Sequence, residues 1–470
     1  MNRKQPETPR AVSIGFISLG CAKNLADSQV MAGVLLSENL QLAPSPEEAD
    51  VILVNTCAFI EDARSEASEA ILRACAHKAD GRCRAVIVAG CLPQRYRDRM
   101  REVFPDVDAF LGVDELEQVG AIVREVAAGR HDILAVSSEL PTRLFRPRLP
   151  ALRFSGGPFA YLKVAEGCDH ACAFCAIPGI RGRYRSRGID DLAEEARALL
   201  DSGARELNLI SQDTTSYGRD LDPAHRSALP ALLRALDALP GEFWIRILYG
   251  YPSRVTDELL ATMAALRHVC AYLDLPVQHS HPDVLRAMRR ADALDAVADL
   301  PERLRRAVPG LVLRTTCLVG FPGETEAHFD HLREYVAAAR FDHLGVFVYS
   351  PEEGTAAETR EDAPPMEVAE ERRDRLMRLQ QSIVHDRLRG RIGAEARAIL
   401  LQPEAPTTRS GKDGMKMARA VWIARLASQA PEVDGITRVR GVPEDARAGR
   451  FISVRITGVR AYDIEAQFVA

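Results

Sequence analysis

Three cysteines lie close together near the middle of the chain, at Cys168, Cys172 and Cys175. They are separated by three and two residues and follow an apolar run at 161–165. Three thiolates at this spacing can bind one metal centre, and no fourth cysteine stands nearby to complete the set. A structural zinc site has four closed ligands, whereas a centre that performs chemistry keeps one position open. The spacing therefore predicts a metal centre with an open position.

A 4Fe–4S cluster suits this pattern better than its alternatives. Thiolates are the standard ligands of iron–sulfur clusters, and three of them leave one iron of a four-iron cluster free to bind another molecule. A zinc site and an accidental group of thiols remain as alternatives. His170, inside the same loop, is interpreted as a residue that shapes the loop rather than as a ligand.

Three further cysteines share a position relative to predicted strands. Cys21, Cys57 and Cys91 each come just after an apolar run that is typical of a strand. Because the carboxyl ends of parallel strands share one edge of a sheet, these cysteines could meet in a second metal centre. Taken alone, their position is equally compatible with a second metal centre and with three unrelated buried thiols. The remaining cysteines are interpreted as small buried hydrophobic residues: Cys75, Cys83, Cys270 and Cys317.

The elements that must position these cysteines follow from the hydrophobic pattern. Strands are expected at 12–19, 51–55 and 84–89, and helices at about 25–38, 60–77 and 94–102. Strands separated by crossover helices indicate a parallel α/β domain, which we place at residues 11–140. Proline, glycine and basic residues at 136–157 predict a linker.

A second alternating region, residues 155–388, predicts a partial (βα)6 barrel. Its site is expected at the carboxyl ends of the strands, where the Cys168–Cys175 stretch follows the first strand. A charged helix at 364–389 is expected to close this domain. The expected strands are 160–165, 206–210, 244–248, 271–275, 311–318 and 344–348, with helices such as 190–202 and 328–340 between them.

The last region, residues 390–470, predicts a small antiparallel β-barrel, so the whole chain is classed as α/β multidomain. This region is mildly basic, since residues 391–470 contain 13 Lys and Arg against nine Asp and Glu. Its expected strands are 396–401, 420–426, 435–439 and 451–468, the last broken near Gly458.

The length, composition and net charge of the chain limit the classes of protein to which it can belong. A chain of 470 residues suggests about three domains, and its net charge of −5 gives no global case for a nucleic-acid binder. Residues 1–10 lack the apolar stretch of a signal peptide, and no apolar run approaches a spanning helix. We therefore expect a cytoplasmic protein with no membrane partner. Its ten cysteines are then metal ligands or buried thiols rather than disulfides.

The spacing of Cys168, Cys172 and Cys175, with Phe174 before the last cysteine, resembles the signature of the radical S-adenosylmethionine (SAM) superfamily. The resemblance implies that the open iron of a 4Fe–4S cluster binds the amino and carboxylate groups of SAM. It also implies that reduction cleaves SAM to a 5′-deoxyadenosyl radical, which abstracts hydrogen from an unactivated carbon. The cofactor would carry the difficult step, while the protein orients it and excludes water.

The segments around the other three cysteines resemble the N-terminal domain of the methylthiotransferases within that superfamily, and the C-terminal region resembles their TRAM domain. The matching segments are 18–24, 55–59 and 89–94. The resemblance implies a second 4Fe–4S cluster on Cys21, Cys57 and Cys91. It also implies a sulfur donor and a reducing electron donor such as flavodoxin.

Two substrate classes compete within this family: an adenosine of transfer RNA, and an aspartate of the small-subunit ribosomal protein S-twelve. Segments 18–24, 211–218, 275–280 and 349–355 resemble the ribosomal-protein branch, although Ala22 stands where many members have proline. The resemblance implies that the β-carbon of this aspartate receives a methylthio group, with the substrate free or on the small subunit. A transfer-RNA enzyme is the alternative, and a non-catalytic, metal-stabilised RNA-binding protein is a third.

One of these segments contains an acidic pair, Glu352 and Glu353. Beside the barrel mouth this pair would repel a polyanion and suit a basic ribosomal protein. A solvated loop is the alternative interpretation.

Four residues are candidates for contacts to SAM, and no side chain is assigned a catalytic role. Gln212 follows the second barrel strand, where radical SAM enzymes often place a polar group near the SAM amino nitrogen. Gln278 follows the fourth strand, and Arg314 lies on the fifth. Gly320 belongs to a glycine-rich turn that opens a helix and could present backbone amides to a carboxylate or ribose. A purely structural turn is equally compatible with this last pattern.

Overall fold

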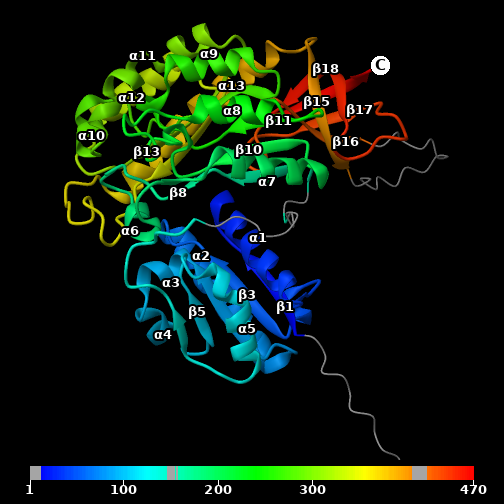
Figure 1. The fold of residues 1–470 in the computed structure, drawn as a ribbon. Helices are drawn as coiled ribbons and strands as arrows, with labels where there is room; N and C mark the ends of the chain where they lie inside the picture. The colour runs from blue at the N-terminus through cyan, green and yellow to red at the C-terminus, as the bar shows by residue number, and fades with distance from the viewer. Residues whose placement is uncertain (1–11, 145–153, 155–156, 405–420) are drawn as a thin grey trace, which may run out of the picture.

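The computed structural model describes residues 12–144, 154, 157–404 and 421–470, which form three units (Figure 1). The N-terminal domain lies below a larger central domain, and the C-terminal barrel packs on the central domain. Half of the linker expected at 136–157, namely 145–153 and 155–156, lies outside the described residues. The domain bounds expected from the sequence stay predictions. No helix in the described part of the chain has the length and apolar character needed to span a membrane.

The N-terminal domain is a sheet of six parallel strands in the order β2-β1-β3-β4-β5-β6. The three strands expected from the sequence are β1, β3 and β4, so this part of the prediction is confirmed. The strands are β1 (Ser13–Ser18), β2 (Gln41–Leu42), β3 (Val51–Thr56), β4 (Ala85–Gly90), β5 (Ala109–Leu111) and β6 (Ile133–Ala135). The helices are α1 (Ala22–Ser37), α2 (Glu61–Asp80), α3 (Cys91–Tyr96), α4 (Arg99–Val103) and α5 (Val119–Ala127).

The central domain is an open sheet of six parallel strands in the order β14-β13-β12-β11-β10-β7, which confirms the partial (βα)6 barrel. A short antiparallel pair, β8 (Ala165–Glu166) and β9 (Arg185–Ser186), follows the first strand. The strands are β7 (Phe159–Lys163), β10 (Glu206–Ile210), β11 (Trp244–Ile247), β12 (Val269–Asp274), β13 (Val312–Val319) and β14 (His343–Val348). The helices are α6 (Ile177–Arg181), α7 (Ile189–Asp201), α8 (Leu229–Asp237), α9 (Asp257–Ala265), α10 (Pro282–Ala287), α11 (Leu294–Ala307), α12 (Glu326–Ala339) and α13 (Met366–Arg389).

The C-terminal domain is a closed five-stranded barrel in the order β15-β16-β17-β19-β18. One pair, β17 with β19, is parallel, whereas the others are antiparallel. A closed ring with an odd number of strands requires at least one parallel pair. The strands are β15 (Glu395–Pro403), β16 (Trp422–Leu426), β17 (Thr437–Arg440), β18 (Phe451–Arg460) and β19 (Asp463–Val469). The expected break near Gly458 lies instead at 461–462, where Ala461 adopts a positive φ of 54°.

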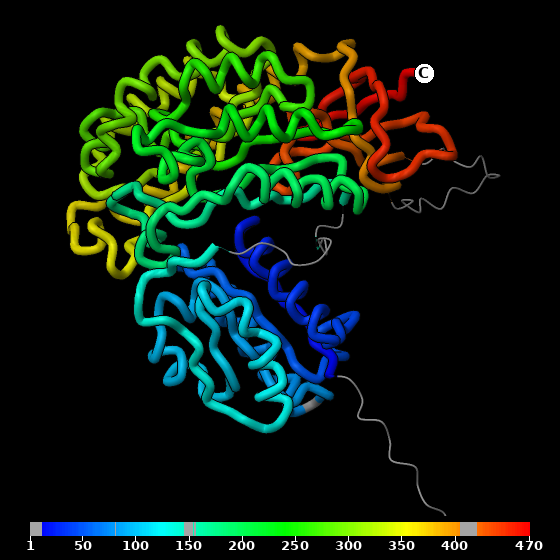
Figure 2. The backbone as a smooth tube through the Cα atoms, viewed as in Figure 1, coloured from blue at the N-terminus to red at the C-terminus, as the bar shows by residue number. Residues whose placement is uncertain are grey.

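The inner face of the open central sheet is covered by the other two domains. Helix α1 rises from the N-terminal domain toward the central domain (Figure 2). Ala26 of α1, Tyr161 and Tyr272 of the sheet, and Ile399 and Ala430 of the C-terminal domain belong to one buried apolar cluster. Because six strands do not close the barrel, this shared core substitutes for the missing strands and fixes how the domains meet.

Candidate metal centres and SAM site

Cys21, Cys57 and Cys91 lie at the carboxyl ends of three adjacent parallel strands. Cys57 and Cys91 directly follow β3 and β4, whose register pairs Thr56 with Gly90. Cys21 comes three residues after β1, which is β3's other neighbour. The strands therefore bring the three thiols to one edge of the sheet, as their positions in the sequence predict.

Glycines before two of these cysteines permit the close approach. Gly20 has φ +87°, and a Cβ placed on it would lie 2.5 Å from the Cβ of Cys57. Gly90 has φ +98°, and a Cβ there would lie 2.3 Å from Oδ1 of Asn55. Larger residues at these turns would both strain the backbone and push the thiol-bearing turns apart.

The electrostatics of this trio suit metal binding. Burial raises the pKa of Cys91 to about 12, the positive charge of Arg181 opposes that shift, and the thiols of Cys57 and Cys21 add to it. Burial also raises the pKa of Cys57, and Cys21 again contributes. The turn before Cys21 lies against Cys57, since a Cβ placed on Gly20 would lie 3.2 Å from the Sγ of Cys57. Thiols that stay protonated in the free protein lose their protons when they bind a metal, so the donor set fits an iron–sulfur cluster.

The loop that carries Cys168, Cys172 and Cys175 follows β7 and β8, at the carboxyl end of the first barrel strand. Its backbone is fixed from three directions. The Cys168 N–H donates to the carbonyl of Gly182 at 3.1 Å, and the Ala173 N–H donates to that of Met288 at 2.9 Å. The Ala173 carbonyl accepts from the Ala357 N–H at 2.9 Å. The three cysteines are therefore held by segments far apart in the chain.

His170 has a structural role in this loop, as the sequence indicates. Its Nε2 lies 2.7 Å from Oδ2 of Asp213, and its ring stacks on Tyr251 with centroids 3.8 Å apart. The imidazole thus anchors the loop to the segments that follow β10 and β11.

The thiols of this loop occupy a partly buried site with a cation nearby: Cys168 is buried, whereas Cys172 and Cys175 are partly exposed. Burial raises the pKa of Cys168 to about 12 and raises the pKa of Cys175 further, with Cys172 contributing to both shifts. Nη1 of Arg290 donates to Sγ of Cys172 at 3.5 Å. Arg290 is 4% exposed and lies over the ring of Tyr251. No sequence motif marks this arginine, because only the fold brings it to the cysteine loop.

Two of the four candidate SAM contacts, Gln212 and Gln278, follow β10 and β12 at the carboxyl end of the central sheet. Nε2 of Gln212 donates to Oε1 of Glu166 at 2.7 Å, whereas its buried Oε1 has no hydrogen-bond partner among the described residues. Such an acceptor fits an ammonium donor such as that of SAM. Gln278 adopts a φ of +67° beyond β12, and its backbone pairs with Thr316 and Leu318. The assignment of both residues stays a prediction.

The other two candidates already have protein partners. Nη1 of Arg314 lies 2.7 Å from Oδ1 of Asp434, in the C-terminal domain. The N–H of Gly320 donates to Oε2 of Glu324 at 3.0 Å. Both assignments stay predictions, and SAM would have to replace these partners to use either group.

Glu352 and Glu353 do not form the free acidic pair that the sequence suggests. The Glu352 side chain is buried, and its carboxylate accepts from Nη1 of Arg95 at 2.9 Å and from Arg64. Glu353 pairs with Arg99 at 2.9 Å on the surface. The expectation of a free acidic pair facing a basic partner is therefore wrong. These carboxylates instead bind arginines of α2, α3 and α4, and so dock the N-terminal domain on the central one.

We expect Glu352→Ala to lower the free energy of unfolding by about 2–4 kcal/mol, because it leaves the buried Arg95 without its carboxylate. Denaturant unfolding of the purified protein measures the loss. The matched control is Glu353→Ala, whose exposed pair contributes about 0–1 kcal/mol. Equal effects of the two substitutions would contradict a docking role for Glu352.

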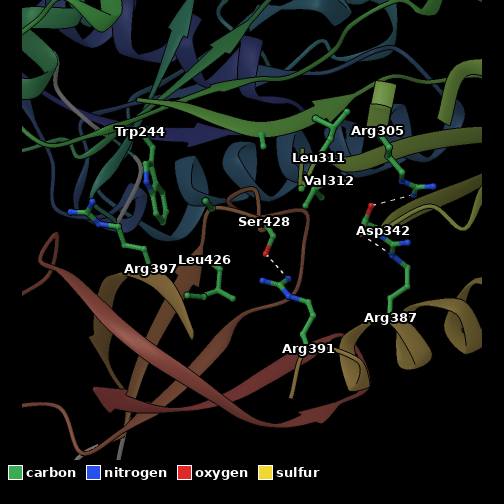
Figure 3. A pocket seen from close by; sticks show the side chains of 14 residues that line it. Trp244, Arg305, Leu311, Val312, Asp342, Arg387, Arg391, Arg397, Leu426 and Ser428 are labelled. Carbon is green, nitrogen blue, oxygen red and sulfur yellow. Dashed lines mark hydrogen bonds and ion pairs between the residues drawn. The ribbon is translucent and has the colours of Figure 1, made fainter. Parts of the chain in front are cut away.

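A separate cavity of about 570 Å³ lies between the central and C-terminal domains (Figure 3). It is lined by Trp244 and Val312, at the amino ends of β11 and β13, and by Leu426 and Ser428. Because the strands are parallel, this is the end of the sheet opposite to the cysteine loop. The cavity is therefore distinct from the candidate metal centres.

Comparison with known proteins agrees with this architecture. Residues 13–112 match the model of the uncharacterized protein family UPF0004, residues 162–336 match the radical SAM superfamily, and residues 413–469 match the TRAM domain. The fold is also shared with the radical SAM methyltransferase TsrM of Kitasatospora setae, at 15% identity and a TM-score of 0.55 over 74% of each chain. The fold and the cysteine loop thus define a radical SAM enzyme.

Full-length relatives identify the family. The chain is 42% identical to the protein named "Ribosomal protein uS12 methylthiotransferase RimO" in Symbiobacterium thermophilum, over 97% of this chain and 90% of the relative. It is 41% identical to the protein of the same name in Solibacter usitatus, over 98% and 95%. The chain belongs to the RimO family of radical SAM methylthiotransferases.

Proposed function

We propose that this enzyme replaces a hydrogen on the β-carbon of an aspartate in ribosomal protein uS12 with a methylthio group. The observation that carries this proposal is the pairing of two three-cysteine sets across one domain interface. Arg181, which ends the helix after Cys175, reaches Cys91 of the other set. The substrate class is supported by the name of the relatives that match the whole chain. Acting on a ribosomal protein would place the enzyme in the cytoplasm.

The proposed cofactors are two 4Fe–4S clusters and SAM. Cys21, Cys57 and Cys91 would hold one cluster, and the three cysteines of the Cys168–Cys175 loop would hold the other. When bound to that loop, cluster and SAM together would supply the 5′-deoxyadenosyl radical that removes the β-hydrogen. The substitution also needs a sulfur donor, a methyl donor and a one-electron reductant. We assign the methyl group to a second SAM and the electron to a donor such as flavodoxin.

The side chains of the protein have defined tasks in this scheme. Oε1 of Gln212 would accept a hydrogen bond from the amino group of SAM. Arg290 places a positive charge beside Cys172 and offsets the negative charge of a bound thiolate. Cys168 is buried, and its burial would help to keep water away from the site where the radical forms.

Anaerobic reconstitution followed by reaction with uS12 tests this function. The protein should bind about eight irons per chain, because two four-iron clusters are expected. With SAM and a reductant it should add the mass of one methylthio group, less one hydrogen, to a uS12 aspartate. Modification of a transfer-RNA adenosine with uS12 unchanged would favour the alternative substrate. Zinc in place of iron, with no 5′-deoxyadenosine formed, would favour a non-catalytic protein.

A further inference from the structure

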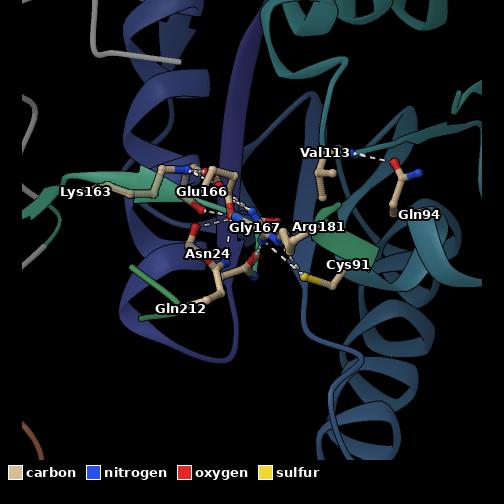
Figure 4. Close-up of polar contacts among 12 residues, drawn as sticks. Asn24, Cys91, Gln94, Val113, Lys163, Glu166, Gly167, Arg181 and Gln212 are labelled. Carbon is tan, nitrogen blue, oxygen red and sulfur yellow. Dashed lines mark hydrogen bonds and ion pairs between the residues drawn. The ribbon is translucent and has the colours of Figure 1, made fainter. Parts of the chain in front are cut away.

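Arg181 joins the two proposed cluster sites directly. It is the last residue of α6, only six positions after Cys175, and its side chain is 3% exposed. Its Nε and Nη2 donate to Sγ of Cys91 at 3.3 and 3.1 Å (Figure 4). An arginine carried by the radical-forming domain thus contacts a proposed ligand in the N-terminal domain.

The remaining donors of Arg181 are held by fixed partners. Nη1 donates to Oδ2 of Asp27 at 2.6 Å and to Oε2 of Glu166 at 3.1 Å. Nη2 also donates to Oδ1 of Asn24 at 3.2 Å. Because the guanidinium is planar and its five N–H groups form a rigid fork, these partners fix the direction in which it faces Cys91.

The charges around Arg181 are balanced within a buried group. Lys163 bonds to Glu166 at 2.7 Å and also to Asp27, so two cations face two carboxylates. The carboxylates of Asp27 and Glu166 accept hydrogen bonds from Arg181 and keep it in place. The group spans both domains, since Asp27 and Asn24 lie on α1.

A hydrogen-bond donor that points at a cysteine ligand of a cluster has two physical effects. Groups that bond to a metal ligand fix its orientation. Positive charge and hydrogen bonds at the ligand sulfur also stabilise the reduced cluster, which carries one more negative charge, and so raise its reduction potential. Among the described residues, Arg181 is the cation that bonds to a cysteine of the N-terminal set.

We propose that Arg181 is a positioning residue that holds Cys91 against the radical-forming domain and raises the reduction potential of the N-terminal cluster. This inference rests on the proposed function, because it requires a cluster on Cys21, Cys57 and Cys91. It assigns the arginine to neither the SAM site nor the substrate.

The test compares Arg181→Gln and Arg181→Lys in the reconstituted full-length protein. A redox titration followed by electron paramagnetic resonance gives the midpoint of each cluster, and the signal that disappears in Cys57→Ala belongs to the N-terminal cluster. We expect Arg181→Gln to shift this midpoint to a more negative value and to reduce methylthio product. Arg181→Lys should give an intermediate shift, because it keeps the charge but loses the fork.

A matched control separates this effect from simple destabilisation. Arg246 is fully buried and bonds to Glu206 at 2.7 Å and to the carbonyl of Ala427, without contact to either cysteine set. Arg246→Gln should destabilise the fold but leave the midpoint unchanged. An Arg181→Gln midpoint equal to the wild-type value would overturn the inference.

Two further outcomes also decide the inference. If Arg181→Gln does not retain the second cluster, a wild-type midpoint in Arg181→Lys overturns the proposal, and a more negative one supports it. A wild-type chain that binds only about four irons would instead overturn the proposed function itself. Eight irons with an unshifted midpoint would overturn only the role of Arg181.

Discussion

Replacing Cys172 by alanine is expected to lower reductive cleavage of SAM by on the order of 10³-fold or more, because the substitution removes a group on which the whole reaction depends. Two thiolates do not hold a four-iron cluster that keeps one iron open for SAM. Iron should fall from about eight to about four per chain, since the N-terminal set is untouched. Chromatographic measurement of 5′-deoxyadenosine and iron analysis report these changes.

Cys270→Ala is the matched control for this substitution. Cys270 lies in the same domain, where it is buried on β12 within the apolar cluster shared by the three domains. The Cys270→Ala variant should keep the iron content and the SAM cleavage of the wild-type protein. Undiminished 5′-deoxyadenosine formation by Cys172→Ala would show that the loop does not carry the SAM-cleaving centre.

Replacing Cys57 by alanine should separate the cleavage of SAM from the addition of the methylthio group. Cys57 lies at the edge of the N-terminal sheet, whereas the Cys168–Cys175 loop is held by segments of the central domain. The variant is therefore expected to keep most SAM cleavage but to lose methylthiolated uS12 by on the order of 10²-fold or more. Parallel assays of 5′-deoxyadenosine and of the modified protein by mass spectrometry measure this separation.

Cys83→Ala provides the control in the same domain. Cys83 is buried two residues before β4, and its thiol donates to the carbonyl of Ala85. Cys83 lies at the end of the sheet opposite to Cys21, Cys57 and Cys91. The Cys83→Ala variant should therefore give wild-type values in both assays. Full methylthiolation by Cys57→Ala would remove the basis for a cluster at this edge.

Much of the fold follows from patterns that are local in the sequence. The long apolar runs of β3, β4, β10 and β13 predict strands within one or two residues of their observed bounds. The strands β2, β5 and β6 were not predicted because two or three residues carry too little periodicity. The parallel pair in the C-terminal barrel depends on how the ring closes, which no single segment specifies.

The sequence by itself predicted the two cysteine sets: the spacing of one is a local feature, and the other rests on strand-end positions together with the family resemblance. It also placed His170 correctly as a loop residue. Only the tertiary structure decided which charges meet. It buried Glu352 against Arg95, turned Arg314 toward Asp434, and brought Arg290 and Arg181 to cysteines that are distant in the chain. The physical reason is that an ion pair between distant residues depends on how whole domains pack. Candidate ligands of a metal centre, in contrast, can be predicted from residue type and spacing.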